Sequence, residues 1–80
     1  MENQDQIGAV HYRDDKIRSA MAVKRLTDKE VASRSGVNRH TVAEVREGVA
    51  QNPTLETLKK LGDVLGLTLQ DLFEPREEVA

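Results

Sequence analysis

The 80-residue chain contains no cysteine and no tryptophan, and Tyr12 and Phe73 are the only members of the Phe, Trp and Tyr class. Without cysteine it can form neither a disulfide framework nor a thiolate metal site, which suits a reducing cytoplasm. The hydrophobic core must therefore be aliphatic. No apolar run approaches the roughly 20 residues that span a bilayer, and the acidic start is unlike a signal peptide. We expect a cytoplasmic domain with no membrane contact and no cofactor or metal.

The net charge is −2, which on its own argues against a polyanionic ligand, but the charges are unevenly distributed. Residues 11–46 carry nine Lys and Arg against five Asp and Glu, a balance of +4. Residues 47–80 carry three basic and seven acidic residues, a balance of −4. A basic half and an acidic half can orient a protein on a polyanion. A mixed, solvated surface explains the charges equally well.

Apolar spacing and capping residues predict an all-α chain with five helices. Thr27 and Glu30 form a capping box, and Gly36 is placed to end the helix that they start. The predicted helices cover residues 14–25, 28–35, 39–47 and 55–65. A one-turn helix follows Thr68, carries Leu69, Leu72 and Phe73, and is ended by Pro75. Residues 1–13 show no helical period and are predicted to be a flexible arm. The domain then covers residues 14–74, and residues 75–80 form a polar tail.

The stretch from Thr27 to Gly48 is the most informative, because two short helices meet there at a glycine turn. A helix-turn-helix unit needs such a turn, since its helices cross steeply within a few residues. Ala32 supplies a small side chain at the expected crossing, and valines hold the pair against the core. The outward side of the helix that follows Asn38 would be free to enter a major groove. From periodicity alone, a generic helical bundle is equally well supported.

Two segments resemble the phage-repressor and Cro-like domains, known as the XRE family: TDKEVASRSGVNRHTVAEVREG and NPTLETLKKLGDVLGLTLQDLF. They stand at the correct separation, and the resemblance runs from about Ile17 to Phe73. It implies a compact five-helix, lambda-repressor-like domain containing a helix-turn-helix. Such domains commonly serve sequence-specific transcriptional regulators that bind double-stranded DNA as dimers. We expect a homodimeric repressor that reads the major groove with the helix beginning near Asn38.

The resemblance also implies roles for individual residues. Base contacts are expected from the helix after Asn38, at Arg39, His40, Thr41 and Glu44. Arg39 suits guanine O6 and N7, whereas Glu44 suits a cytosine amino group. Phosphate contacts are expected at Thr27, Arg34, Asn38, Arg46, Gln51 and Asn52.

The sequence departs from the family pattern at several positions. Asp28 stands where glutamine is frequent, and a carboxylate facing phosphate is unfavourable. The loop after residue 48 has no charge, although the family's loop is usually basic. Met21 and Arg46 replace a frequent arginine–glutamate pair, so we expect Met21 in the core and Arg46 turned outward. Gly62 replaces a usual alanine and is expected to permit close packing. These departures predict weaker, more salt-sensitive DNA binding.

A protein-interaction module, such as an adaptor or an antitoxin, is the alternative, and Asp28, Glu44 and the neutral loop favour it. An enzyme is not expected, because His11 and His40 are too far apart in sequence to suggest a metal or catalytic pair. No serine or carboxylate pair has an activating neighbour at motif spacing, and no glycine-rich phosphate loop exists. For the dimer surface, the candidates are Leu69, Leu72 and Phe73, or the segment 7–12.

Overall fold

The structure, a computed structural model, describes residues 12–50 and 53–75, and within these ranges the chain forms five α-helices and no strand. The helices are α1 (Asp14–Lys24), α2 (Asp28–Ser35), α3 (Arg39–Glu47), α4 (Leu55–Leu65) and α5 (Leu69–Leu72). The expected all-α, five-helix fold is confirmed. None of these helices is long and apolar enough to cross a membrane.

The helix boundaries follow the predicted capping residues. Thr27 Oγ1 accepts a hydrogen bond from the Glu30 N–H at 3.1 Å, and the Glu30 carboxylate accepts one from the Thr27 N–H at 2.9 Å. Gly36 closes α2 in the left-handed region at φ 78°. Helix α1 ends one residue earlier than predicted, because Arg25 takes the left-handed conformation at φ 56°.

The core is aliphatic, as expected, with one aromatic exception. Its buried side chains come from all five helices and from the residue two positions before α1: Tyr12, Ile17, Met21, Val31, Val42, Val45, Leu58, Leu61, Leu65 and Leu72. Burying one such aliphatic side chain contributes about 1.5–3 kcal/mol. Among the leucines of α4, Leu55 is the exception, since it begins the helix and lies exposed.

The folded domain begins before the predicted boundary. Tyr12 is only 3% exposed, and its hydroxyl donates to the Val45 carbonyl at 2.7 Å. The Arg13 N–H donates to the Leu72 carbonyl at 2.7 Å, and the Arg13 guanidinium donates to the Pro75 carbonyl. Assigning residues 12 and 13 to a flexible arm was therefore wrong. The rest of that arm, residues 1–11, and residues 76–80 of the tail lie outside the described residues.

Gly62 permits a close approach inside α4, as predicted. A Cβ atom at this position would lie 2.4 Å from the Leu67 carbonyl oxygen, and real Cβ atoms essentially never come within 3.0 Å of another heavy atom in this way. The same turn is tied by a hydrogen bond from the Leu67 N–H to the Gly62 carbonyl at 2.8 Å. The glycine therefore lets the chain fold tightly back from α4 toward α5.

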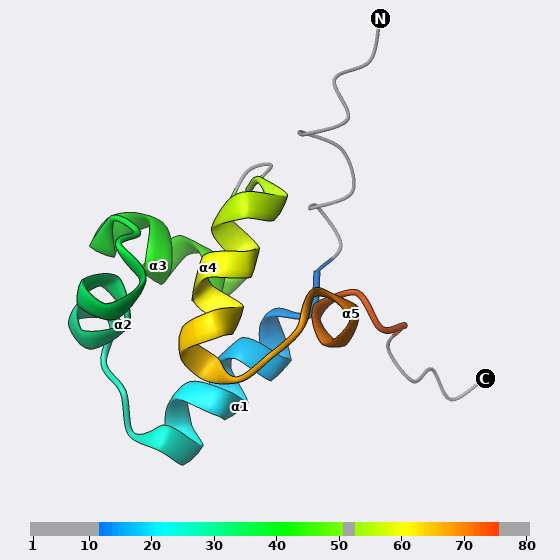
Figure 1. Cartoon of the computed structure of the whole chain (residues 1–80), viewed down its shortest axis with the longest axis horizontal. Helices are drawn as coiled ribbons and strands as arrows, with labels where there is room; N and C mark the ends of the chain where they lie inside the picture. The colour runs from blue at the N-terminus through cyan, green and yellow to red at the C-terminus, as the bar shows by residue number, and fades with distance from the viewer. Residues whose placement is uncertain (1–11, 51–52, 76–80) are drawn as a thin grey trace, which may run out of the picture.

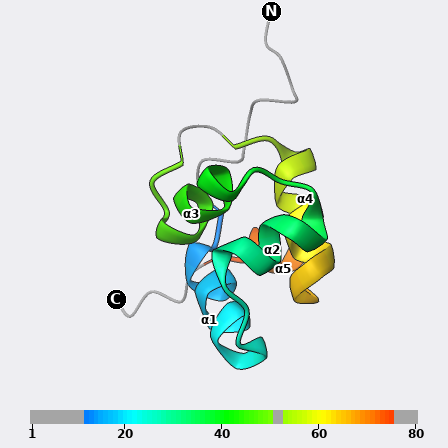
Figure 2. The same cartoon turned by 90° about the vertical axis from the view of Figure 1, so that its left-hand side faces the viewer.

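The helices are arranged so that α2 and α3 occupy one side of the molecule (Figure 1). Helix α4 packs behind α2, and α1 packs against α3, α4 and α5. Helix α5 lies on the far side of α1 and α4 from the α2–α3 pair (Figure 1). Figure 2 turns the α2–α3 side toward the viewer, and no other helix covers it. In the described structure, α2 and α3 therefore face solvent together on this side.

Candidate nucleic-acid interface

The turn between α2 and α3 is built from three residues. The Gly36 N–H donates to the Ala32 carbonyl at 2.9 Å, and the Val37 N–H donates to Ser35 Oγ at 3.1 Å. Asn38 then caps α3, its side-chain oxygen accepting from the His40 N–H at 2.7 Å. Two short helices that are joined by a tight turn and pack on each other form a helix-turn-helix.

The position of α3 is set by its apolar side. Val42 and Val45 are fully buried against the core, so the opposite side of the helix faces solvent. Arg39 and His40 are exposed in the first turn, and the His40 side chain is 81% exposed. The Glu44 carboxylate lies one turn later, with its Oε2 atom 3.3 Å from His40 Nε2. Three of the four residues predicted to contact bases thus share one outward face.

The fourth predicted base-contact residue is placed differently. Thr41 is half-buried, because it lies at the edge between the buried valines of α3 and the outward face. Its methyl and hydroxyl groups are therefore less accessible than the side chains of Arg39 and His40.

Positive charge that is not paired with a carboxylate gathers around this helix pair. Within residues 12–50 and 53–75, six Lys and Arg side chains form ion pairs with carboxylates. Three of these six side chains lie in α1 or directly before it: Arg13, Lys16 and Arg18. The remaining cations of the described ranges are exposed and form no ion pair there: Lys24, Arg25, Lys29, Arg34 and Arg39. All of them lie between the end of α1 and the start of α3. An unpaired cation keeps its attraction for an anion from outside.

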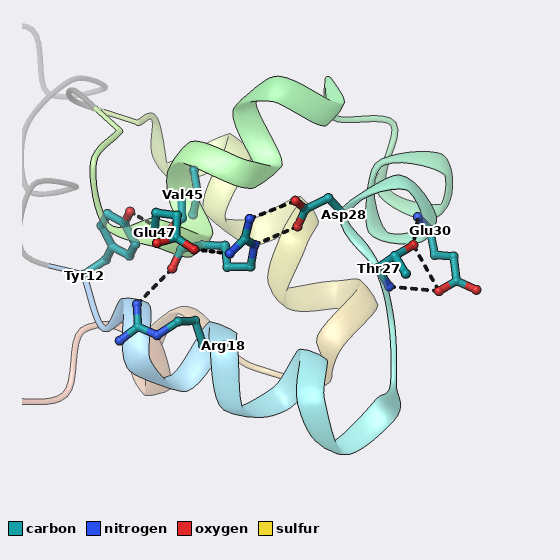
Figure 3. Close-up of polar contacts among 8 residues, drawn as sticks. Tyr12, Arg18, Thr27, Asp28, Glu30, Val45 and Glu47 are labelled. Atoms are coloured by element: carbon teal, nitrogen blue, oxygen red, sulfur yellow. Dashed lines mark hydrogen bonds and ion pairs between the residues drawn. The ribbon is translucent and has the colours of Figure 1, made fainter.

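Arg46 was expected to turn outward, but in the structure its guanidinium is held by carboxylates. Its Nε and Nη2 atoms donate to the two oxygens of Asp28 at 2.8 and 2.9 Å, and its Nη1 atom contacts the Glu47 carboxylate. The hydrogen bonds to Asp28 raise the pKa of Arg46 above its usual value. Figure 3 labels both carboxylate partners and shows two dashed contacts at Asp28, the first residue of α2. Arg46 is therefore only partly turned outward, with its side chain 29% exposed, whereas Met21 lies in the core as expected.

The family model of the Cro/C1-type HTH DNA-binding domain matches residues 16–78. The chain belongs to this family. The resemblance noted in the sequence is thereby confirmed, and in general terms the Cro/C1-type domain is a DNA-binding regulator. Comparisons with curated proteins and with solved structures found no match.

Two residues predicted to bind phosphate already have hydrogen-bond partners within the Cro/C1-type domain. Both the N–H and the hydroxyl of Thr27 interact with Glu30, whose pKa is lowered by these hydrogen bonds (Figure 3). A phosphate at the start of α2 would therefore meet the Glu30 carboxylate. The Asn38 side chain is occupied by the His40 N–H. Gln51 and Asn52 lie outside the described residues, so their predicted contacts stay predictions.

Two contacts that hold the end of α3 in the Cro/C1-type domain could not be predicted from the sequence. The Tyr12 hydroxyl donates to the Val45 carbonyl, and Arg18 Nη1 donates to the Arg46 carbonyl at 3.0 Å (Figure 3). Carbonyls in the last turn of a helix have no partner within that helix. Tyr12 and α1 supply these partners and thereby fix the direction of α3. No periodic pattern links Tyr12 to Val45, because 33 residues separate them.

Proposed function

We propose that this protein is a sequence-specific transcriptional regulator, acting as a repressor, that lays α3 in the major groove of double-stranded DNA. The observation that carries the proposal is the outward first turn of α3, where Arg39 and His40 are exposed while Val42 and Val45 anchor the helix. A helix presented in this way fits a major groove, which is about 12 Å wide.

The side chains on this face suit different base edges. Arg39 makes no ion pair with any described residue, so its guanidinium is available for the O6 and N7 atoms of guanine. His40 reaches a neighbouring base edge, and Glu44 orients it from one turn away or accepts from a cytosine amino group. Thr41, which is half-buried, contributes at most a contact to a thymine methyl.

Phosphate contacts would come from the unpaired cations that flank α3. Arg34 in the last turn of α2 is exposed and is not within ion-pair distance of a carboxylate among the described residues, although its charge helps to lower the pKa of Glu30; its exposure supports the predicted role. Lys29 and Arg39 extend the same positive region. Phosphate contacts fix the position of a protein on DNA, whereas base contacts select the sequence.

We propose that the protein acts as a homodimer, because one α3 face reaches only a few base pairs. Two copies on half-sites one helical turn apart would double the contacted sequence. Two suggested dimer-surface residues are unsuitable, since Leu72 and Tyr12 are buried in the core. Leu69 and Phe73 remain candidates because both are partly exposed. Residues 7–11 lie outside the described ranges.

The alternative of a protein-interaction module or antitoxin loses part of its support. It rested on the carboxylates of Asp28 and Glu44 and on the neutral loop after residue 48. Asp28 is paired with Arg46, and Glu44 lies against His40, so neither carboxylate stands alone beside the outward face of α3. A partner protein recovered together with a failure to bind DNA would restore this alternative.

A selection of bound duplexes from a random pool tests the proposal. We expect the wild-type chain to enrich one sequence, and its affinity to fall steeply between about 50 and 200 mM salt. Arg39→Ala should relax the preference at one base pair, at a cost of about 1–3 kcal/mol for the preferred duplex. Lys16→Ala is a matched control, because it removes one positive charge beside Glu74, next to α5. No enrichment and no salt dependence would refute the proposal.

A further inference from the structure

The Asp28–Arg46 pair joins the first residue of α2 to the last turn of α3. Both oxygens of the carboxylate accept hydrogen bonds from the guanidinium, at 2.8 and 2.9 Å, in a two-point contact. The side chains are 22% and 29% exposed, so the pair is partly covered by the domain. A two-point contact of this kind fixes both side chains more tightly than a single hydrogen bond does.

The pair also borders the face of α3 that we propose to contact DNA. Arg46 follows Arg39 by seven residues, nearly two full helical turns, so both lie on about the same side of α3. The two residues are about 10 Å apart along the helix axis. A bare carboxylate at Asp28, beside Arg46, would lie at the border of this face and would repel any phosphate that comes within the screening length of about 8 Å.

These observations assign Arg46 a role that differs from a phosphate contact. We infer that Arg46 is a positioning residue, which neutralises the Asp28 carboxylate at the border of the DNA-facing side and does not itself bind DNA. The inference rests on the proposed function, because it concerns how the same face is made acceptable to phosphate. Glu47 adds a second carboxylate to the guanidinium, which leaves Arg46 fewer donors for any outside group.

The two roles predict different behaviour when both charges are removed. If Arg46 binds a phosphate directly, Arg46→Met loses that contact, and a second change at Asp28 does not replace it. If Arg46 neutralises Asp28, the harm comes from the bare carboxylate, and Asp28→Asn removes it. The double variant has the net charge of the wild type. Replacing both members of a paired set is usually well tolerated by a fold.

The test measures affinity for a mixed-sequence duplex of about 20 base pairs, two helical turns, for the full chain and each variant. Circular dichroism establishes that each variant is folded at the assay temperature. We expect Arg46→Met to bind about tenfold more weakly than the wild type, because the bare Asp28 carboxylate repels the DNA. The double variant Asp28→Asn/Arg46→Met should bind within about twofold of the wild type, because neither a bare carboxylate nor a lost phosphate contact then weakens it.

A measurement on the unaltered chain supplements the variants. The Nε–H resonance of Arg46, which donates to Asp28 Oδ1, should keep its chemical shift when the duplex is added. The Nε–H resonance of Arg39 should shift in the same titration. A shift at Arg46 comparable with that at Arg39 would mean that the pair opens on DNA, and the inference would be overturned.

The outcomes separate this inference from the proposed function. Failure of the wild type to bind any duplex overturns both. Wild-type binding with a double variant that stays about tenfold weaker overturns the positioning role alone and makes Arg46 a phosphate contact. Wild-type binding that Arg46→Met leaves unchanged also overturns it, because Asp28 would then lie too far from the DNA to matter.

Discussion

Replacing Tyr12 by phenylalanine removes one hydrogen bond while keeping the aromatic ring in the core. The Tyr12 hydroxyl donates to the Val45 carbonyl at 2.7 Å in a buried setting. Leaving a buried acceptor without a partner costs about 1–3 kcal/mol. The Val45 carbonyl keeps one donor, the Gly48 N–H at 3.2 Å, so we expect the lower end, about 1 kcal/mol. Urea unfolding at pH 7 measures this loss.

The same hydroxyl makes the stability depend on pH. Burial, reinforced by the Asp14 carboxylate and opposed by Arg18, raises the pKa of Tyr12 to about 12. An unfolded tyrosine has a pKa of about 10. Below pH 10 the hydroxyl is protonated in both states, and its contribution is complete. Between about pH 10 and 12 only the unfolded state loses the proton, so stability falls by about 1.4 kcal/mol per pH unit.

The two effects combine into one comparison. The wild type should exceed Tyr12→Phe by about 1 kcal/mol at pH 7, and this advantage should vanish near pH 11. Groups that titrate alike in both proteins, such as lysines, cancel in the difference. Equal stabilities at pH 7 together with parallel profiles up to pH 11 would refute the reasoning, because the hydroxyl would then make no contribution.

Three further variants test other parts of the structure. Gly62→Ala should lower the free energy of unfolding by about 2 kcal/mol despite alanine's better helix propensity, because its Cβ would press on the Leu67 carbonyl oxygen; a stabilised variant in urea unfolding would contradict this. Leu72→Ala should cost about 2–5 kcal/mol while leaving the sedimentation behaviour unchanged, whereas a shift to monomer without loss of stability would make Leu72 a dimer contact. Arg34→Ala should weaken binding to all duplexes alike and reduce the salt slope by about 1, and a sequence-dependent loss would instead identify a base contact.

The helix boundaries could be predicted because their causes are local. A capping box needs only Thr27 and Glu30, and a left-handed helix end needs only a residue such as Gly36 in the right place. The buried valines of α3 follow from helical spacing in the same way. Arg25 was missed as a helix end, because a non-glycine residue in the left-handed region leaves no mark in the sequence.

The contacts between distant segments were not predictable from such rules. Tyr12 lies in a segment without helical period, and its partner Val45 is 33 residues away. Leu72 was suggested as a dimer contact because a helix of one turn is too short to define a buried side. In the sequence, Asp28 and Arg46 are two separate departures from the family pattern. Their opposite charges were the one indication that they compensate each other.

The central claim is that the outward start of α3 lies against bases in the major groove. Methylation protection at guanine N7 tests it directly, since that atom lies in the major groove. On the duplex recovered by selection, the wild type should protect at least one guanine N7, and Arg39→Ala should restore its reactivity. Adenine N3, in the minor groove, should stay reactive throughout. Protection confined to adenine N3, or guanine protection that survives Arg39→Ala unchanged, would contradict the account.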